Sequence, residues 1–141
     1  MTDMIYKILS VADWEAAEAA GRFEGSADDR RDGFIHFSDG QQVIGTAAKY
    51  FAGQSRLVLL TVDPGRLTDL RWEKSRGDAL FPHLYGPLEL DAVDRADRLP
   101  DDHDPAETIA ALLGDYGAEG PSHNLWRHYQ EQLRLSTSHR P

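Results

Sequence analysis

The feature that most constrains the fold is an almost unbroken apolar run at Leu57–Val62. A strand with apolar side chains at nearly every position is typical of a sheet that is covered on both faces. The 141 residues of the chain are enough to bury such a strand in the core of one domain. The run therefore predicts a globular domain built around a central strand.

Strand-forming and helix-forming segments alternate around this run. Ser10 is a typical helix N-cap, and Gly21 is a typical helix end, so a helix is predicted between them, with Trp14 on its apolar face. The other predicted elements are strands at residues 4–9, 33–38, 70–73 and 88–93, and a helix that begins after Ser38 and ends at Gly53. The predicted fold class is α+β.

Three connecting segments contain few apolar residues or several prolines. Residues 24–33 are polar and contain glycines, which predicts a mobile loop. The alternative is a lid whose Arg30 or Arg31 reaches an anionic ligand. Residues 74–79 are predicted as a polar loop, and residues 82–87 as a stiff loop or sheet edge, because proline has no N–H to donate within a sheet.

The composition changes after residue 98. Residues 1–98 are predicted as the α+β domain, and residues 99–141 as an acidic linker with a helical C-terminal extension. Asp104 and Pro105 predict the start of a helix that ends near Leu113, and a last helix is predicted at 123–135. This extension either docks on the domain or binds a partner.

The net charge and the composition argue against several classes of protein. The net charge of −9 argues against binding to nucleic acid, because phosphate contacts need a basic surface. No apolar run approaches the roughly 18–20 residues that a membrane helix needs, and no secretion signal is present. The absence of cysteine removes disulfides and thiol chemistry. A cytoplasmic location and no membrane association are therefore expected.

The strand at 33–38 carries the first candidate site residues. His36 points to the opposite face from Ile35 and Phe37, because side chains alternate along a strand. Its imidazole is a candidate acid, base or ligand contact, or alternatively a core histidine with satisfied nitrogens. Ser38 is a candidate ligand contact or helix cap.

The segment at 81–87 carries a second histidine and a tyrosine between two prolines. A rigid loop fixes the direction of His83, which favours a role in ligand contact. Tyr85 either stacks on a planar ring or covers the core. Our central hypothesis is that His36 and His83 meet across one pocket.

Residues 71–73 add charged and aromatic candidates. Glu73 is a candidate catalytic carboxylate, or alternatively the partner of Arg71 in a surface ion pair. Trp72 and Arg71 are assigned to ligand binding with Ser38 and Tyr85, whereas His36, His83 and Glu73 are assigned to catalysis. No metal site is expected, since no histidine pair has the i, i+4 spacing of a helical metal site.

Several segments together resemble a bacterial family of unknown function, domain of unknown function 952. The segments that carry this resemblance are Ile5-Tyr6-Lys7-Ile8, Trp14, Asp32-Gly33-Phe34-Ile35-His36-Phe37-Ser38, Tyr50-Phe51, Leu57–Asp63, Arg71-Trp72-Glu73 and Phe81-Pro82-His83-Leu84-Tyr85-Gly86-Pro87-Leu88. They occur in that order and cover about residues 4–95. That family is similar in fold to ADP-ribosyltransferases, which implies a split sheet of mixed or antiparallel strands around an NAD-binding cleft.

The resemblance implies glycosyl transfer through an oxocarbenium-like state, with NAD or another nucleotide-like small molecule as ligand. Such chemistry needs a hydrogen-bond donor, an aromatic ring and a carboxylate around the ribose. Glu73 and Glu89 are the carboxylates that this region offers. The alternative is a module that binds a ligand or a protein without catalysis, because fold similarity alone does not establish an activity.

Overall fold

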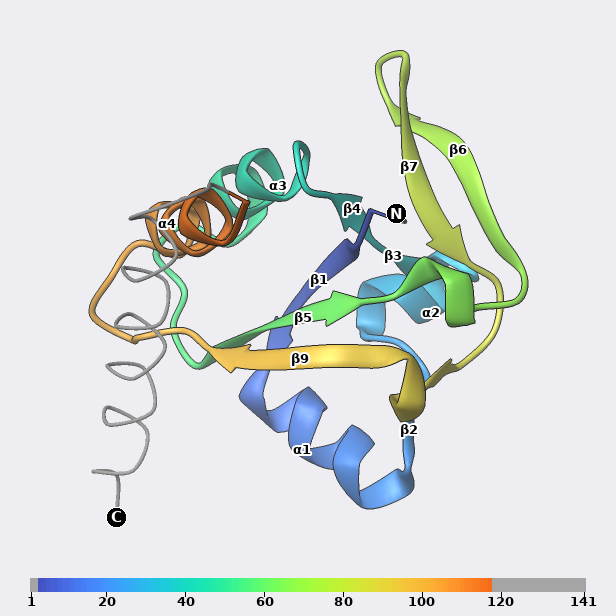
Figure 1. Ribbon diagram of the computed structural model, residues 1–141. Coiled ribbons are helices and arrows are strands. Elements are labelled where there is room, and N and C mark those ends of the chain that lie inside the picture. Colours follow the sequence, from blue (N-terminus) through green and yellow to red (C-terminus); the bar gives the residue numbers. More distant parts are fainter. Residues whose placement is uncertain (1–2, 118–141) are drawn as a thin grey trace.

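The computed structural model describes residues 3–117, which form two antiparallel sheets packed with helices (Figure 1). The larger sheet has the strand order β4-β1-β5-β9, the smaller one has the order β3-β7-β6, and β2 pairs with β8 alone. The strands are β1 Ile5–Ser10, β2 Arg22–Phe23, β3 Ile35–His36, β4 Ser38–Asp39, β5 Leu57–Val62, β6 Leu70–Arg76, β7 Ala79–Leu84, β8 Leu88–Glu89 and β9 Val93–Arg98. The helices are α1 Val11–Ala20, α2 Ala27–Asp32, α3 Val43–Tyr50 and α4 Pro105–Gly117, with 3₁₀ turns at Pro64–Arg66 and Leu90–Ala92.

Strand β5 lies inside the larger sheet, between β1 and β9, and all six of its residues are buried. Its side chains alternate between two hydrophobic clusters. Val58, Leu60 and Val62 belong to the cluster that α1 covers, whereas Leu57 and Leu59 belong to the cluster under α3 and α4. The prediction of a strand buried on both faces is confirmed.

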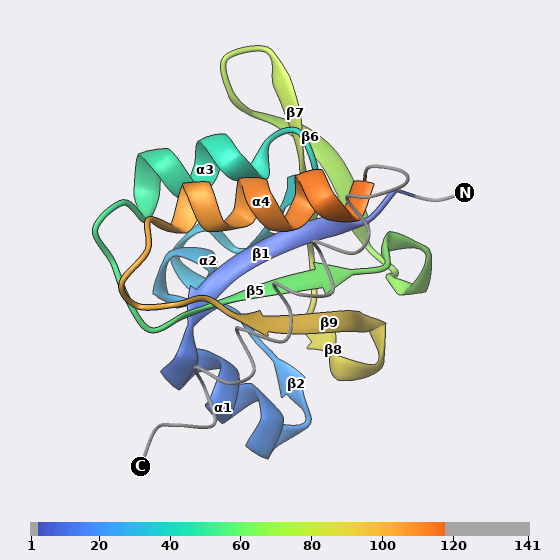
Figure 2. The same ribbon diagram turned by 60° about the vertical axis from the view of Figure 1, so that its left-hand side comes forward.

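Helices α3 and α4 lie side by side over one face of the larger sheet (Figure 2). The α4 residues Ile109 and Leu112 are fully buried against this face. The carboxylate of Asp104 accepts from the backbone N–H of Glu107, as expected for an N-cap, and α4 continues beyond the predicted end at Leu113. The helix predicted at 123–135 lies outside the described residues.

The smaller sheet corrects two predictions about loops. Strand β7 is central in this sheet although it contains Pro82, and the residues predicted as a loop at 74–79 form the end of a hairpin between β6 and β7. The Pro82 carbonyl accepts from Phe37 N–H at 3.0 Å, just beyond the end of β3. Proline is tolerated at this position because the neighbouring strand has ended and needs no donor there.

The segment predicted as one strand at 33–38 divides between the two sheets. Ile35 and His36 pair with β7 in the smaller sheet, and Ser38 pairs with Tyr6 in the larger one. The strand predicted at 88–93 is likewise interrupted, by the 3₁₀ turn at Leu90–Ala92. The first of these breaks carries the chain from one sheet to the other directly beside the candidate site.

Residues 24–33 contain helix α2, which corrects the prediction of a mobile loop. Ser26 Oγ accepts from Asp29 N–H at 3.3 Å, and Asp29 Oδ2 accepts from Ser26 N–H at 2.9 Å. This reciprocal capping box starts the helix, and Gly33 ends it in a left-handed conformation with φ of 87°. The capping-box motif is present in the sequence, but α2 has no apolar stripe, so hydrophobic periodicity does not predict the helix.

Replacing Ser26 by alanine is expected to lower the free energy of unfolding by about 1 kcal/mol, because it removes one half of the capping box. Urea denaturation of the variant beside the parent protein measures this loss. Ser75→Ala, at an exposed position of β6, is the matched control and is expected to change stability by less than about 0.5 kcal/mol. Equal stability of the Ser26 variant and the parent would contradict this account of α2.

Candidate functional site

The two candidate histidines face each other across β3 and β7. His36 and His83 are cross-strand partners, and their ring centroids are 5.7 Å apart. Both rings line one cavity of about 600 Å³, a volume within the usual range for small-molecule sites. The structure therefore brings the two stretches together at one pocket, as the central hypothesis expects.

The cavity forms where the edge of β1 is left uncovered. Strand β4 pairs only with Ile5 and Tyr6, so the edge of β1 from Lys7 to Ser10 borders the cavity instead of another strand. Helix α2 supplies one wall and helix α3 another. The charged, polar and aromatic residues that line the cavity include Lys7, Asp13, Asp28, Asp29, Arg31, Asp32, His36, Ser38, Thr46, Tyr50, Phe51, Phe81 and His83.

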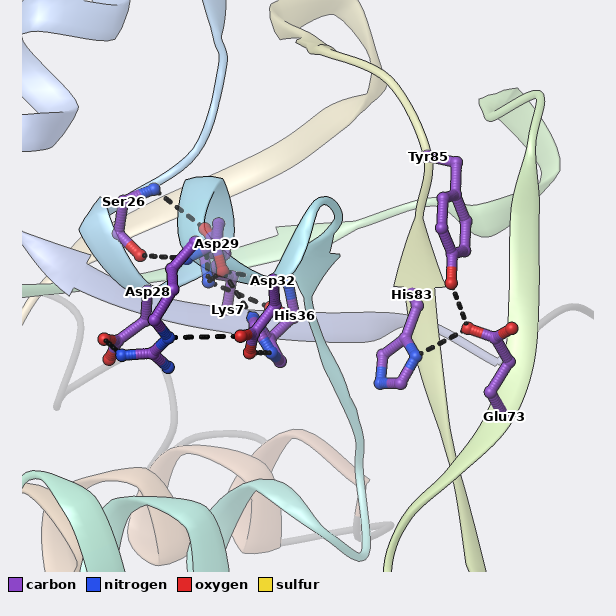
Figure 3. Close-up of polar contacts among 10 residues, drawn as sticks. Lys7, Ser26, Asp28, Asp29, Asp32, His36, Glu73, His83 and Tyr85 are labelled. Carbon is purple, nitrogen blue, oxygen red and sulfur yellow. Dashed lines mark hydrogen bonds and ion pairs between the residues drawn. The ribbon is translucent and has the colours of Figure 1, made fainter.

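His83 is held by a carboxylate on the neighbouring strand (Figure 3). Its Nδ1 lies 2.9 Å from Glu73 Oε1, and the hydroxyl of Tyr85 donates to the same oxygen at 2.7 Å. The Phe34 ring stacks on the imidazole with centroids 4.0 Å apart. Hydrogen bonds from Tyr85 and then His83 lower the pKa of Glu73, and the bond to Glu73 raises the pKa of Tyr85.

The other nitrogen of His83 is the unusual atom of the site. The His83 side chain is only 4% exposed, and within residues 3–117 its Nε2 is buried without a hydrogen-bond partner. A carboxylate only accepts hydrogen bonds, so the contact with Glu73 assigns the proton to Nδ1 of the neutral ring. In this neutral form Nε2 is an acceptor, and His83 is one of the residues that line the cavity.

His36 has a different environment, because both of its nitrogens face carboxylates. Nδ1 lies 2.6 Å from Asp29 Oδ1, and Nε2 lies 2.9 Å from Asp32 Oδ2 (Figure 3). Only a ring with protons on both nitrogens can donate to both carboxylates. Both nitrogens of His36 therefore contact carboxylates from helix α2. His83, in contrast, has one nitrogen that is left for another group.

Asp29 and Lys7 form a buried ion pair beneath His36. Lys7 Nζ lies 3.1 Å from Asp29 Oδ2 and donates to the His36 carbonyl at 2.9 Å. Burial lowers the pKa of Lys7, against the opposing charge of Asp29. Burial would raise the pKa of Asp29, but the hydrogen bond from His36 and the charge of Lys7 together hold it well below its usual value.

The lowered pKa of Asp29 predicts how stability depends on pH. The unfolded chain binds a proton at Asp29 near its ordinary pKa of about 3.9, whereas the folded protein does not. The stabilisation is therefore complete above about pH 5 and is lost as the pH falls below about 4. In urea denaturation between pH 7 and pH 3, the stability difference between the parent and Asp29→Asn is expected to shrink as the pH falls. A difference that stays constant would contradict this role of Asp29.

The remaining predicted site residues lie in two places. Ser38 lines the cavity, where its hydroxyl lies 2.9 Å from that of Thr46. Arg71 does not line the cavity but lies over the Tyr85 ring, with its guanidinium carbon 4.6 Å from the centroid. Trp72 alternates with Arg71 and Glu73 along β6, so it faces the other side of the smaller sheet and is not brought together with His83.

Several residues of the site were not among the sequence candidates: Lys7, Asp29, Asp32 and Phe34. The Ser26-x-x-Asp29 spacing is a capping-box signal that could have placed Asp29 at the start of a helix. Asp32 and His36 have the i, i+4 spacing of a helical pair, but α2 ends at Asp32 and His36 lies in β3, so helical periodicity does not predict their contact. Phe34 could have been found from alternation alone, since it shares a face with His36.

Comparisons with known proteins define the family. Residues 8–96 match the model of the family described as "Protein of unknown function (DUF952)", which is more than half of the chain. The chain therefore belongs to this family, as the sequence resemblance indicated. None of the curated proteins compared with the chain matches it.

Solved structures of a bacterial relative also match this chain. The crystal structure of protein CC0527 from Caulobacter crescentus has 54% sequence identity and a TM-score of 0.69, and the match covers 76% of this chain and 98% of that chain. The solution NMR structure of CC0527 has 57% identity and a TM-score of 0.63, and covers 72% and 90% of the two chains. This chain is homologous to CC0527.

No helix within residues 3–117 combines the length and the apolar character that crossing a membrane requires. In the same residues, no three histidine, aspartate or glutamate side chains form a group that could hold a metal ion.

Proposed function

We propose that the cavity binds a small molecule of nucleoside or nucleotide type, and that His83 Nε2 accepts a hydrogen bond or a proton from it. The observation that carries this proposal is the buried Nε2, which has no partner within residues 3–117 while Nδ1 is fixed by Glu73. A carboxylate–histidine pair of this kind orients the ring and leaves the second nitrogen to act as a base.

The walls of the cavity support a ligand that is both planar and polar. Tyr50, Phe51 and Phe81 contribute aromatic surface, and Ser38 and Thr46 contribute hydroxyl groups. Aromatic rings favour stacking with a flat heterocycle. Hydroxyl groups favour a sugar, because each can donate and accept hydrogen bonds.

ADP-ribosyl or another glycosyl transfer is the reaction that we propose for such a ligand, with NAD as the first substrate to test. The two antiparallel sheets, which residues 35–39 connect, fit the split sheet of an ADP-ribosyltransferase-like fold. In this proposal His83 acts as the base, Glu73 orients it, and Asp29 holds the neighbouring ring of His36 in place.

Glu73 also favours a second candidate, a binding module without catalysis. Its Oε1 is engaged by both His83 and Tyr85, and the residue does not line the cavity. A carboxylate held in this way orients the histidine but does not contact the sugar of a bound ligand. Binding is therefore the first function to test, and transfer the second.

Isothermal titration with NAD, ADP-ribose and nicotinamide riboside tests the proposal, together with an assay for release of nicotinamide from NAD. Saturable binding of at least one of these molecules is expected. Trp72→Ala is the matched control, because it removes an exposed ring from the opposite face of the same hairpin, and it is expected to bind as the parent does. Absence of binding to every molecule of this set would contradict the proposed function, and binding without turnover would favour the non-catalytic module.

A further inference from the structure

We infer that the cavity takes a nucleoside-like group, a sugar with a planar base that is neutral or positively charged, and excludes a phosphate. This inference rests on the proposed binding of a small molecule and narrows the ligand class to nucleosides, so that NAD and AMP are expected to bind more weakly. It follows from the carboxylate partners of the cationic side chains and from the negative charge of the residues that line the cavity.

The lysine and the arginine that line the cavity both have carboxylate partners. Lys7 is paired with Asp29 at 3.1 Å, and its side chain is only 7% exposed. Arg31 contacts Asp28 at 2.9 Å and Asp32 at 3.1 Å. Among the described lining residues these are the only lysine and arginine, so the positive charge that would attract a phosphate is already paired with carboxylates.

Helices α1 and α2, whose N-termini lie next to the cavity, have side-chain caps. Ser10 Oγ accepts from Asp13 N–H at the start of α1, and the box formed by Ser26 and Asp29 closes α2. Helix α3 has no side-chain cap, but Asp39 Oδ1 accepts from the N–H groups of residues 41 and 42, which precede the helix, at 2.9 and 2.8 Å. Free N–H groups at a helix start are the usual backbone contacts of a phosphate, and in α1 and α2 a side chain already holds one of them.

The net charge of the residues that line the cavity also disfavours a phosphate. Four aspartates, which are Asp13, Asp28, Asp29 and Asp32, share the wall with Lys7 and Arg31. The wall is negative when both imidazoles are neutral and uncharged at most when both are protonated. A phosphate is repelled or gains nothing there, whereas a sugar hydroxyl can donate to His83 Nε2, and a cationic base is tolerated.

Calorimetric titration with two matched series tests the inference: nicotinamide riboside against its 5′-monophosphate, and adenosine against AMP. The parent protein is expected to bind the nucleoside of at least one series at least tenfold more tightly than its phosphate at 50 mM salt. The ratio is expected to fall at 300 mM salt, because ions screen the repulsion.

Asp28→Asn provides the second measurement, since it releases one nitrogen of Arg31 at an exposed position. We expect the preference for the nucleoside to fall at least threefold in this variant. Asp94→Asn, at an exposed position of β9, is the control of equal charge change and is expected to keep the preference.

The outcomes separate the inference from the proposed function. A monophosphate or NAD that binds as tightly as the nucleoside, with affinity that His83→Asn abolishes, would overturn the inference and leave the proposed function standing. A lack of saturable binding in both series and for NAD would overturn both. An equal loss of preference in Asp28→Asn and Asp94→Asn would also overturn the inference, because it would trace the preference to net charge instead of the released Arg31.

Discussion

Replacing Asp29 by alanine is expected to lower the free energy of unfolding by about 3–5 kcal/mol, because it leaves the Lys7 ammonium buried without its counter-charge. The Asp29 side chain is 2% exposed, so solvent does not screen the pair. The same carboxylate also accepts from the backbone N–H groups of Ser26 and His36, which lose their partners in the variant. Urea denaturation at pH 7 measures the loss.

Two further variants identify the cause of this loss. Asp28→Ala removes a neighbouring but exposed carboxylate and is expected to change stability by less than about 0.5 kcal/mol. Combining Asp29→Ala with Lys7→Met removes the unpaired charge and is expected to recover part of the stability. A loss below about 1 kcal/mol in Asp29→Ala, or no recovery in the double variant, would show that the buried pair does not hold this wall of the cavity together.

Replacing His83 by asparagine is expected to weaken binding of the ligand about ten- to a hundredfold, because a buried hydrogen bond to Nε2 is lost. The asparagine amide reaches the position of Nδ1 and can still donate to Glu73, but it has no atom at the position of Nε2. The variant therefore keeps the contact within the protein and removes the contact with the ligand. Titration with the tightest probe of the nucleoside and NAD series measures the change.

His83→Gln is the matched variant, since its longer side chain places an amide near the position of Nε2. Partial recovery of affinity relative to His83→Asn is expected. Thermal unfolding of both variants serves as the control that the fold is intact. Unchanged affinity in His83→Asn would contradict the assignment of His83 as the ligand contact, whatever the effect on stability.

The central strand and the direction of the His36 side chain could be predicted from the sequence because they depend on local patterns. An apolar run predicts a buried strand at Leu57–Val62, and alternation places His36 away from Ile35. The roles of the two rings could not be separated in this way. They depend on which carboxylates approach each ring, and those carboxylates come from α2 and β6.

Helix α2 and strand β7 were not predicted, because both depend on tertiary contacts. Helix α2 has no apolar stripe, because its buried residue is the charged Asp29, which packs against Lys7 and His36. Strand β7 contains Pro82, which is tolerated because β3 ends beside it. In both cases a tertiary contact made a locally unfavourable residue acceptable, and single-sequence patterns do not record such contacts.

The most direct test of the site is the tautomer of His83, which a two-bond ¹H–¹⁵N correlation spectrum of the uniformly labelled protein reports. The account predicts a neutral ring that carries its proton on Nδ1, hydrogen-bonded to Glu73, with Nε2 unprotonated and shifted when the ligand is added. A proton on Nε2 in the free protein, or an Nε2 signal that a saturating ligand leaves unchanged, would contradict the claim that this nitrogen is the acceptor of the cavity.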